Sequence, residues 1–239
     1  MRLLDCFCKA GGASEGYRHA DFEVVGLDIQ PQPNYPYEFI QGDALEYLKH
    51  ADLSKFDAIH ASPPCQTDCD YRRKGHGVGD GYPDLIAPIR DLLQATGLPY
   101  IIENVTGAHH KLHNPIRLCG SSFGLDIRRH RYFETSFPAL ALPCNHAWQT
   151  PRFPAATNRV KNSRRTVEIG VWRIPLPVQQ RAMGIDWMTL SELSEAIPPA
   201  YTQHIGRQLA HLLAPTKTGL VGGKLDEAGS EQHTIESRD

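Results

Sequence analysis

Residues 3–12 read Leu-Leu-Asp-Cys-Phe-Cys-Lys-Ala-Gly-Gly, a short apolar run that ends in a pair of glycines. The run Leu3–Phe7 is typical of a buried strand, and we expect a helix over Ala13–Ala20. Paired glycines between a strand and a helix let backbone amides approach a ligand, with the helix N-terminus behind them. The stretch is not Gly-x-Gly-x-x-Gly, which disfavours a nicotinamide dinucleotide as that ligand.

The rest of the first half continues the alternation of strands and helices. Further strands are expected at Glu23–Leu27, Phe56–Ala61 and Tyr100–Glu103, with a helix over Leu85–Ala95. This alternation predicts an α/β fold with a mostly parallel, doubly wound sheet. Ligands collect at the carboxyl ends of the strands in such sheets, which is where Asp28, residues 62–65 and Glu103 fall.

The chain divides into four parts by composition. An α/β part covers 1–137, and a small, proline-rich and basic segment covers 138–175. Residues 176–214, with expected helices at Gln179–Met183 and Tyr201–Leu213, complete the α/β part. Residues 215–239 lack periodicity and are predicted to be a disordered tail.

Composition restricts the class of protein. The 239 residues are 41% hydrophobic and 22% charged, and no apolar run approaches the length of a membrane span. A strand-like start leaves no room for a signal peptide, so we expect a cytoplasmic protein. We also expect a monomer.

Charge is unevenly distributed along the chain. Residues 1–127 carry 11 Lys and Arg against 17 Asp and Glu, whereas residues 128–181 carry 10 against 2. A basic middle predicts that one side of the molecule binds a polyanion, although an ordinary solvated basic face is the simpler alternative.

The six cysteines do not indicate a disulfide scaffold in a chain of this length. Cys6, Cys8 and Cys119 lie in apolar surroundings and are expected to be buried thiols. A zinc site from Cys65, Cys69, Cys144 and His146 is conceivable, but its spacing matches no compact ligand pattern, so we expect no metal.

Three motifs follow one another in a specific order: Pro63-Pro64-Cys65-Gln66, Glu103-Asn104-Val105 and Arg129-His130-Arg131. Arg181-Ala182-Met183-Gly184 and Ala196-Ile197-Pro198-Pro199 come after them, before Ile205-Gly206. With these motifs the chain resembles the DNA (cytosine-5) methyltransferase family, in its compact bacteriophage type. The resemblance runs from Leu3 to about Leu213 and implies a Rossmann-like, S-adenosylmethionine-dependent methyltransferase fold. It implies a cofactor-binding and catalytic domain over 1–137, completed by 176–214, and a small target-recognition segment over 138–175. For a phage-encoded protein, the expected compartment is the cytoplasm of the host.

The resemblance implies a covalent mechanism on cytosine in double-stranded DNA. Cys65 would attack C6 of the base as a thiolate, which turns C5 into a nucleophile. Glu103 would hydrogen-bond the ring, while Arg129 and Arg131 would hold the base and its phosphate. The base must leave the duplex for this chemistry. The alternatives are a structural carboxylate at Glu103 and an inert thiol at Cys65.

The resemblance also implies S-adenosylmethionine as cofactor. Phe7 would stack on the adenine, Asp28 would bind the ribose, and Asp43 would reach the adenine amine. A helix N-cap is the alternative for Asp43. The remaining cofactor contacts implied are Ala10, Gly11, Gly12, Ile29, Ala44 and Pro63.

Basic residues predict the contacts with DNA. Arg72, Arg73 and Lys74 precede glycines at 75, 77, 79 and 81, which suits a lid that closes over the flipped base, or else a merely disordered loop. Further contacts are expected from Gln66, Arg159, Lys161, Arg164 and Arg165. A recognition segment this short favours a short target or almost no sequence preference.

Lys9 departs from the family, which usually has glycine at this position. A lysine there would suit a donor with an extra carboxylate, such as carboxy-S-adenosylmethionine, and the product would be 5-carboxymethylcytosine. Alternatively, Lys9 turns outward or pairs with Glu195, which replaces the family's asparagine. Residues 67–70, Thr-Asp-Cys-Asp, also depart from the family, but the diproline turn favours Cys65 over Cys69 as nucleophile.

The sequence therefore predicts a DNA cytosine-C5 alkyltransferase. Three alternatives stay open: an ordinary 5-methylcytosine methyltransferase in which Lys9 is incidental, an RNA cytosine methyltransferase, and an inactive DNA-binding homologue. The presence of Cys65, Glu103 and both arginines argues against the inactive homologue.

Overall fold

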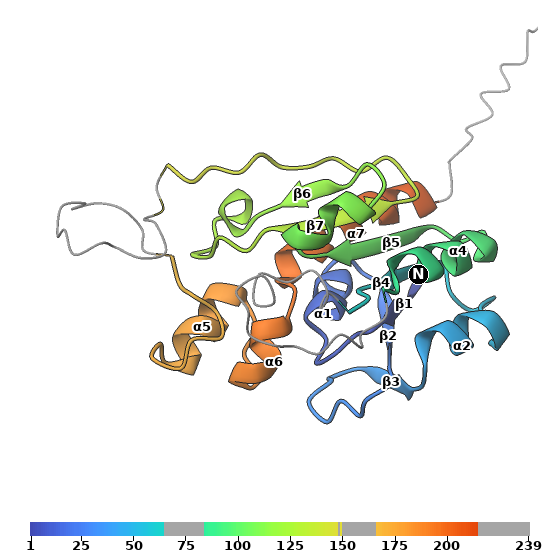
Figure 1. Cartoon of the computed structure of the whole chain (residues 1–239), viewed down its shortest axis with the longest axis horizontal. Coiled ribbons are helices and arrows are strands. Elements are labelled where there is room, and N and C mark those ends of the chain that lie inside the picture. The colour runs from blue at the N-terminus through green and yellow to red at the C-terminus, as the bar shows by residue number, and fades with distance from the viewer. Residues whose placement is uncertain (65–83, 148, 150–165, 215–239) are drawn as a thin grey trace, which may run out of the picture.

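The computed structural model of the chain describes residues 1–64, 84–147, 149 and 166–214 (Figure 1). Its centre is a seven-stranded sheet in the order β3-β2-β1-β4-β5-β7-β6. Strands β1 to β5 pair in parallel, whereas β7 is antiparallel to both β5 and β6. The strands are β1 (Arg2–Cys6), β2 (Glu23–Asp28), β3 (Glu38–Gln41), β4 (Ala58–Ala61), β5 (Tyr100–Asn104), β6 (Ile116–Leu118) and β7 (Arg131–Thr135).

Helices cover both faces of this sheet. They are α1 (Gly12–Arg18), α2 (Ala44–His50), α4 (Ile86–Thr96), α5 (Leu176–Met183), α6 (Leu190–Glu195) and α7 (Pro199–Leu213), with 3-10 turns η1 (Thr106–Lys111) and η2 (Gly120–Phe123). Alternate strand residues enter opposite cores: Leu4 packs in the cluster with α2 and α4, whereas Leu3 packs in the cluster with α1 and α7. This is the side-chain period of a strand buried on both faces. The predicted doubly wound α/β fold is confirmed.

The C-terminal helix α7 packs closely against α1. A side chain at Gly16 would collide with Thr202 and with the Pro199 carbonyl, and a Cβ at Gly206 would lie 2.8 Å from the Cβ of Ala20. Because both glycines lack a side chain, the backbones of α1 and α7 can approach closely. The C-terminal end of the described chain therefore packs against its N-terminal part. Among the described residues, no helix has the length and apolar content needed to cross a bilayer.

The predicted elements are present, with their ends shifted by up to three residues, but β3, β6, β7 and α6 had no prediction. Strand β6 has three residues and β3 has four. Strands this short carry little periodicity, and the pairing of β3 with β2 and of β6 with β7, rather than local preference, defines them.

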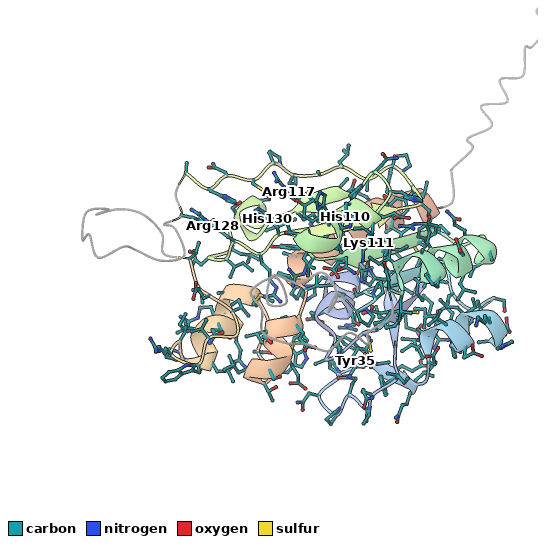
Figure 2. All side chains as sticks on the ribbon, in the orientation of Figure 1. Tyr35, His110, Lys111, Arg117, Arg128 and His130 are labelled. Atoms are coloured by element: carbon teal, nitrogen blue, oxygen red, sulfur yellow. The ribbon has the colours of Figure 1, made fainter. Side chains whose placement is uncertain are left out.

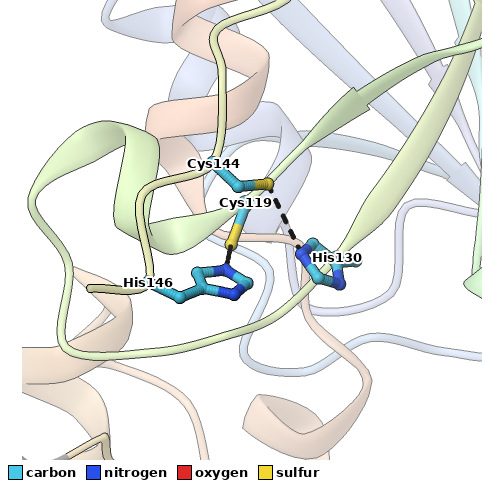
Figure 3. Close-up of side chains that lie close together, drawn as sticks. All are labelled: Cys119, His130, Cys144 and His146. Carbon is cyan, nitrogen blue, oxygen red and sulfur yellow. Dashed lines mark hydrogen bonds between the residues drawn. The ribbon is translucent and has the colours of Figure 1, made fainter. Parts of the chain in front are cut away.

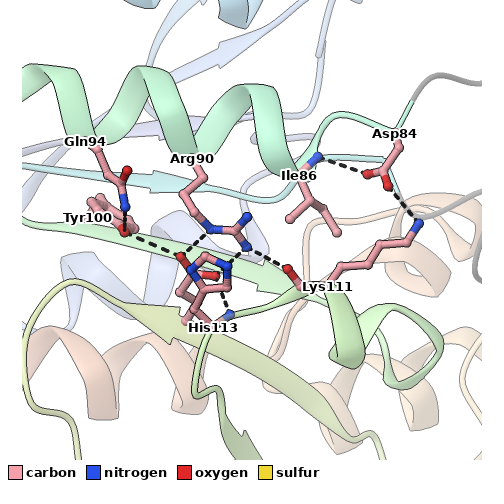
Figure 4. Close-up of polar contacts among 8 residues, drawn as sticks. Asp84, Ile86, Arg90, Gln94, Tyr100, Lys111 and His113 are labelled. Carbon is pink, nitrogen blue, oxygen red and sulfur yellow. Dashed lines mark hydrogen bonds and ion pairs between the residues drawn. The ribbon is translucent and has the colours of Figure 1, made fainter.

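A buried ion pair joins α4 to the antiparallel part of the sheet (Figure 4). Arg90 donates from Nε and Nη2 to the two oxygens of Glu134, both at 2.7 Å, and a further bond runs from Nη2 to the Lys111 carbonyl at 2.7 Å. The His113 amide donates to Glu134 at 2.8 Å. Burial raises the pKa of Glu134, but the bonds from Arg90 and His113 outweigh burial and keep the pKa below its usual value.

Arg90→Leu should therefore be strongly destabilising, because it leaves the Glu134 carboxylate buried without its charged partner. We expect a loss of about 3–5 kcal/mol, which lowers the melting temperature by roughly 10 °C. The matched control is Lys49→Met, which breaks the exposed Lys49–Glu46 pair (2.9 Å) and should leave the melting temperature nearly unchanged. Thermal melts followed by circular dichroism measure both variants, and shifts of similar size would contradict the expectation.

Candidate active site

A cavity of about 1060 Å³ opens at the carboxyl ends of the parallel strands. Its walls come from the segments that follow β1, β2, β3, β4 and β5, together with residues in and around α6. Asp28, Pro63 and Glu103, which end or follow these strands, all line this cavity, as expected from their positions in the sequence.

The loop after β1 has an unusual backbone. Phe7 and Lys9 have φ angles of 60° and 48°, in the left-handed region that non-glycine residues rarely adopt. The Lys9 amide donates to Asp28 Oδ2 at 3.1 Å, and Trp187 Nε1 donates to the Ala10 carbonyl at 2.9 Å. Strain of this kind persists only where surrounding contacts over-determine the conformation, and it concentrates at binding sites.

Asp28, Ile29 and Asp43, which were predicted to contact the cofactor, all line the cavity. Asp28 is buried and accepts hydrogen bonds from the amides of Lys9 and Gln30, and its neighbour Ile29 lines the cavity although 56% of its surface is exposed. Asp43 accepts from the Glu46 amide at 3.0 Å as the N-cap of α2. The capping role of Asp43 is confirmed, and because Asp43 also lines the cavity its predicted ligand contact stays open.

Glu103 is buried at the end of β5 and faces Arg131 from β7. The Arg131 Nε atom lies 2.9 Å from Glu103 Oε1 as an ion-pair partner, yet among the described residues Oε1 has no partner with hydrogen-bond geometry. Burial raises the pKa of Glu103, and this effect exceeds the lowering by Arg131, Arg129 and Ser62. The carboxyl group is thus held in place with one oxygen able to take part in a ligand hydrogen bond.

The structure separates the two arginines that the sequence analysis placed together. Arg131 lines the cavity, whereas Arg129 is not among the described lining residues. Arg129 Nη2 donates to the Ser194 carbonyl, and the Arg129 carbonyl accepts from Tyr201 Oη at 2.5 Å. In a regular strand, residues two apart point to the same side of the sheet. Arg129 precedes β7, so this rule does not place its side chain beside that of Arg131.

Lys9 pairs with Glu195 across the cavity, with 3.4 Å between Nζ and Oε2. This confirms the pairing that the sequence analysis gave as an alternative. The described lining residues include two cations, Lys9 and Arg131, and six acidic groups: Asp5, Asp28, Asp43, Glu103, Glu192 and Glu195. Burial raises the pKa of Asp5 and of Glu103, but the other four carboxylates still outnumber the cations. A cavity of this charge favours a ligand with a positive group.

Asp5 is a site residue that the sequence analysis did not select. It is fully buried in β1, lines the cavity and accepts from Ser14 Oγ at 2.5 Å, while its Oδ1 has no hydrogen-bond partner among the described residues. Burial, with repulsion from Asp28 and Glu103, raises the pKa of Asp5 to about 7 despite the Ser14 hydrogen bond. A carboxyl group inside the apolar run of residues 3–7 was the signal that could have identified it.

The raised pKa of Asp5 predicts an unusual pH dependence of stability. Between the unfolded value of 3.8 and the folded value of about 7, the folded protein retains a proton that the unfolded chain releases. Stability from this group is therefore lost as pH rises through that window, by about 4 kcal/mol in total. Asp5→Asn should remove this loss, so its advantage in melting temperature over the wild type should grow from pH 4.5 to pH 7.5. Asp91→Asn, on an exposed position of α4, should keep the wild-type slope, and parallel slopes for all three proteins would refute the assignment.

Several predicted residues lie outside the described part of the chain, so their roles stay predictions: Cys65, Gln66, Arg72, Arg73, Lys74, Arg159, Lys161, Arg164 and Arg165. The residues before Cys65 are described. Asn104 Nδ2 donates to the Pro63 carbonyl at 3.1 Å, and Pro64 lines the cavity. The start of the diproline turn is thus fixed to the end of β5, beside Glu103.

Part of the basic middle of the chain is used internally. Figure 2 labels Arg117, Arg128 and His130, which come from β6 and the segment before β7. Arg128 donates to Gln149 Oε1 at 3.2 Å and to the His146 carbonyl at 3.3 Å. These contacts occupy Nε and Nη2 of Arg128 and tie it to the segment after β7.

The fold is similar to those of solved methyltransferases. The S. pombe Dnmt2 methyltransferase aligns with a TM-score of 0.58 at 13% identity, over 90% of this chain and 99% of that one. An E. coli protein described as a candidate DNA modification methyltransferase encoded within a prophage gives 0.56 at 15% identity, over 89% and 99%. The Entamoeba histolytica methyltransferase EhMeth gives 0.55 at 14%, over 90% and 99%. No protein-family model and no curated protein matches the chain. At these identities the likeness establishes that this chain has the Rossmann-like fold of these methyltransferases.

Proposed function

We propose that the protein is a DNA cytosine-C5 methyltransferase that uses S-adenosylmethionine and acts on a cytosine flipped out of double-stranded DNA. The observation that carries the proposal is the buried Glu103, which faces Arg131 at 2.9 Å beside the Pro63-Pro64 turn that leads to Cys65. The prophage neighbour, described as a DNA modification methyltransferase, supports DNA rather than RNA as substrate.

The cofactor would occupy the half of the cavity formed by the loop after β1 and the end of β2. Phe7, Ile29, Asp28 and Asp43 line this half, which offers apolar surface for an adenine and carboxylates for hydroxyl and amine groups. The surplus of lining carboxylates suits a sulfonium cation. When bound, S-adenosylmethionine supplies an electrophilic methyl group.

The other half of the cavity supplies the groups that activate the base. Cys65, as a thiolate, would form a bond to C6, and the electron pair displaced from the C5–C6 bond makes C5 nucleophilic. Glu103 would hold a proton at ring N3, so that charge developing on the base is stabilised. The pKa of Glu103, raised by burial, favours the protonated carboxyl group that this step requires. Arg131 would orient Glu103, and loss of the C5 proton would expel Cys65 again.

Lys9 supports a second candidate, in which the group transferred is carboxymethyl from carboxy-S-adenosylmethionine. Lys9 lines the cavity, and its pair with Glu195 is weak because the two side chains are 50% and 58% exposed. A donor carboxylate could displace Glu195 from Lys9. Against this, each lining carboxylate would repel an additional negative charge, so methyl transfer is favoured.

The test incubates the full chain with double-stranded DNA and each donor separately, then identifies the modified nucleosides by mass spectrometry. We expect 5-methylcytosine from S-adenosylmethionine, and a single-stranded RNA arm should give at least tenfold less product. If only the carboxylated donor gave a product, and the Lys9→Gly variant did not form it, the proposed reaction would be carboxymethyl transfer in place of methyl transfer. Absence of modified cytosine with both donors would refute the proposed function.

A further inference from the structure

Four potential metal ligands lie together outside the cavity, at the edge of the antiparallel strands. Cys119 follows β6, His130 precedes β7, and Cys144 and His146 belong to the segment after β7 (Figure 3). One ligand atom from each residue lies within 4.8 Å of all the others. None of the four lines the proposed active site.

The short contacts in the cluster have the dimensions of a tetrahedral metal site. Cys119 Sγ lies 3.2 Å from His146 Nε2, and Cys144 Sγ lies 3.5 Å from His130 Nε2. Zn–S bonds of about 2.3 Å and Zn–N bonds of about 2.0 Å in a tetrahedron place sulfur and nitrogen about 3.5 Å apart. The longer separations need a contraction of roughly 1 Å, which the partly exposed segment of Cys144 and His146 can supply.

The chemistry of the four donors also suits zinc. Two thiolates and two imidazoles in a tetrahedral arrangement are typical of Zn²⁺, and four protein ligands leave no position for a substrate, as in structural sites.

We propose that Cys119, His130, Cys144 and His146 form a structural Zn²⁺ site. The ion would join β6, the start of β7 and the segment after β7. The described part of that last segment has little regular secondary structure. His130 stands between Arg129 and Arg131, so the ion would also fix the approach of Arg131 to Glu103. The Arg128 bond to the His146 carbonyl holds the same segment from the other side.

The proposed site differs from the ligand set considered from the sequence, in which Cys65 and Cys69 lie outside the described residues. Cys144 and His146 are shared with that set, but the structure adds Cys119, which was expected to be only a buried thiol, and His130, which stood within the arginine motif. Cys119 is indeed fully buried, yet two imidazoles lie beside it. These ligands are spread over residues 119–146, so no compact spacing announces them.

The experiment measures metal in the full chain, expressed without an affinity tag that binds metal and purified without added zinc. Mass spectrometry of the metal content should find about one zinc per chain. Cys144→Ser and His146→Asn should each lower it at least tenfold. Cys69→Ser, which removes a ligand of the sequence-based set, and His110→Asn, at an exposed position of η1, should keep the wild-type content.

Replacement of zinc by Co²⁺ gives a second readout on the wild type, which decides the question even if a ligand variant does not fold. The visible spectrum should be that of tetrahedral cobalt with thiolate ligands, and a chelator should abolish it and lower the melting temperature. The proposal would be overturned if the purified protein held no zinc and gave an octahedral spectrum after cobalt was added. It would also be overturned if the purified protein held no zinc and only four of the six cysteines titrated under denaturing, non-reducing conditions. That result would indicate a Cys119–Cys144 disulfide. Loss of zinc in Cys69→Ser would overturn the ligand set.

Discussion

Cys65→Ala is expected to abolish both turnover and covalent capture of the protein on DNA that contains 5-fluorocytosine. The reaction releases Cys65 only when the proton at C5 departs, and fluorine at that position cannot leave in the same way. Wild-type protein with donor and this DNA should therefore accumulate an adduct that survives denaturing electrophoresis. Without the thiolate no bond to C6 forms, and turnover on ordinary DNA should fall by at least about 1000-fold.

Cys69→Ser is the matched control for this experiment, because it removes a thiol four residues away and leaves the diproline turn intact. It should form the adduct at a rate within about threefold of the wild type. An adduct that persists in Cys65→Ala but disappears in Cys69→Ser would identify Cys69 as the nucleophile. A wild type that forms no adduct with either donor would contradict the covalent mechanism.

The parallel half of the fold could be predicted because its signals are local. The buried runs at β1, β2, β4 and β5 are nearly continuous and apolar, as expected of strands covered on both faces. The antiparallel half could not. Strand β7 reads Arg-Tyr-Phe-Glu-Thr. Its two charged residues pair with Glu103 and Arg90, which are distant in sequence. Only tertiary pairing makes such a segment a buried strand.

The same distinction applies to the candidate site. Glu103 and Asp28 were predicted because they stand where a recognisable strand ends. The parting of Arg129 from Arg131 depends on a contact with the Ser194 carbonyl, which no local pattern contains. The metal cluster likewise depends on the meeting of three segments. Motifs predicted residues that line the cavity, whereas contacts that arise from packing had no local signal in the sequence.

Glu103 shows how the site uses burial and charge against each other. Asp5 and Glu103 are buried carboxyl groups that interact unfavourably, and burial raises the pKa of each. Arg131 opposes this effect at Glu103 without restoring an ordinary pKa. The result is a carboxyl group that keeps its proton to a higher pH than an ordinary glutamate does and is still oriented by a cation. A general acid for a ring nitrogen needs both properties.

Glu103→Gln should lower kcat by about 100- to 1000-fold, because the amide keeps the size of the side chain but cannot deliver a proton to the base. Affinity for S-adenosylmethionine, measured by calorimetry, should change by less than about threefold, since Glu103 belongs to the base-binding half of the cavity. In the wild type, kcat should fall as pH rises through the raised pKa of Glu103 and the proton is lost, whereas the variant should lack this dependence.

Glu134→Gln is the matched control, because it makes the same chemical change at another buried carboxylate. Glu134 lies on β7, pairs with Arg90 of α4 and does not line the cavity. It should lower the melting temperature and leave kcat near the wild-type value at 20 °C, where both variants are first shown to be folded. Equal losses of kcat in the two variants would mean that Glu103 acts through stability alone. A Glu103→Gln enzyme within about threefold of wild-type kcat would remove Glu103 from the mechanism, because a group that holds a proton in the transition state cannot be replaced by an amide at so small a cost.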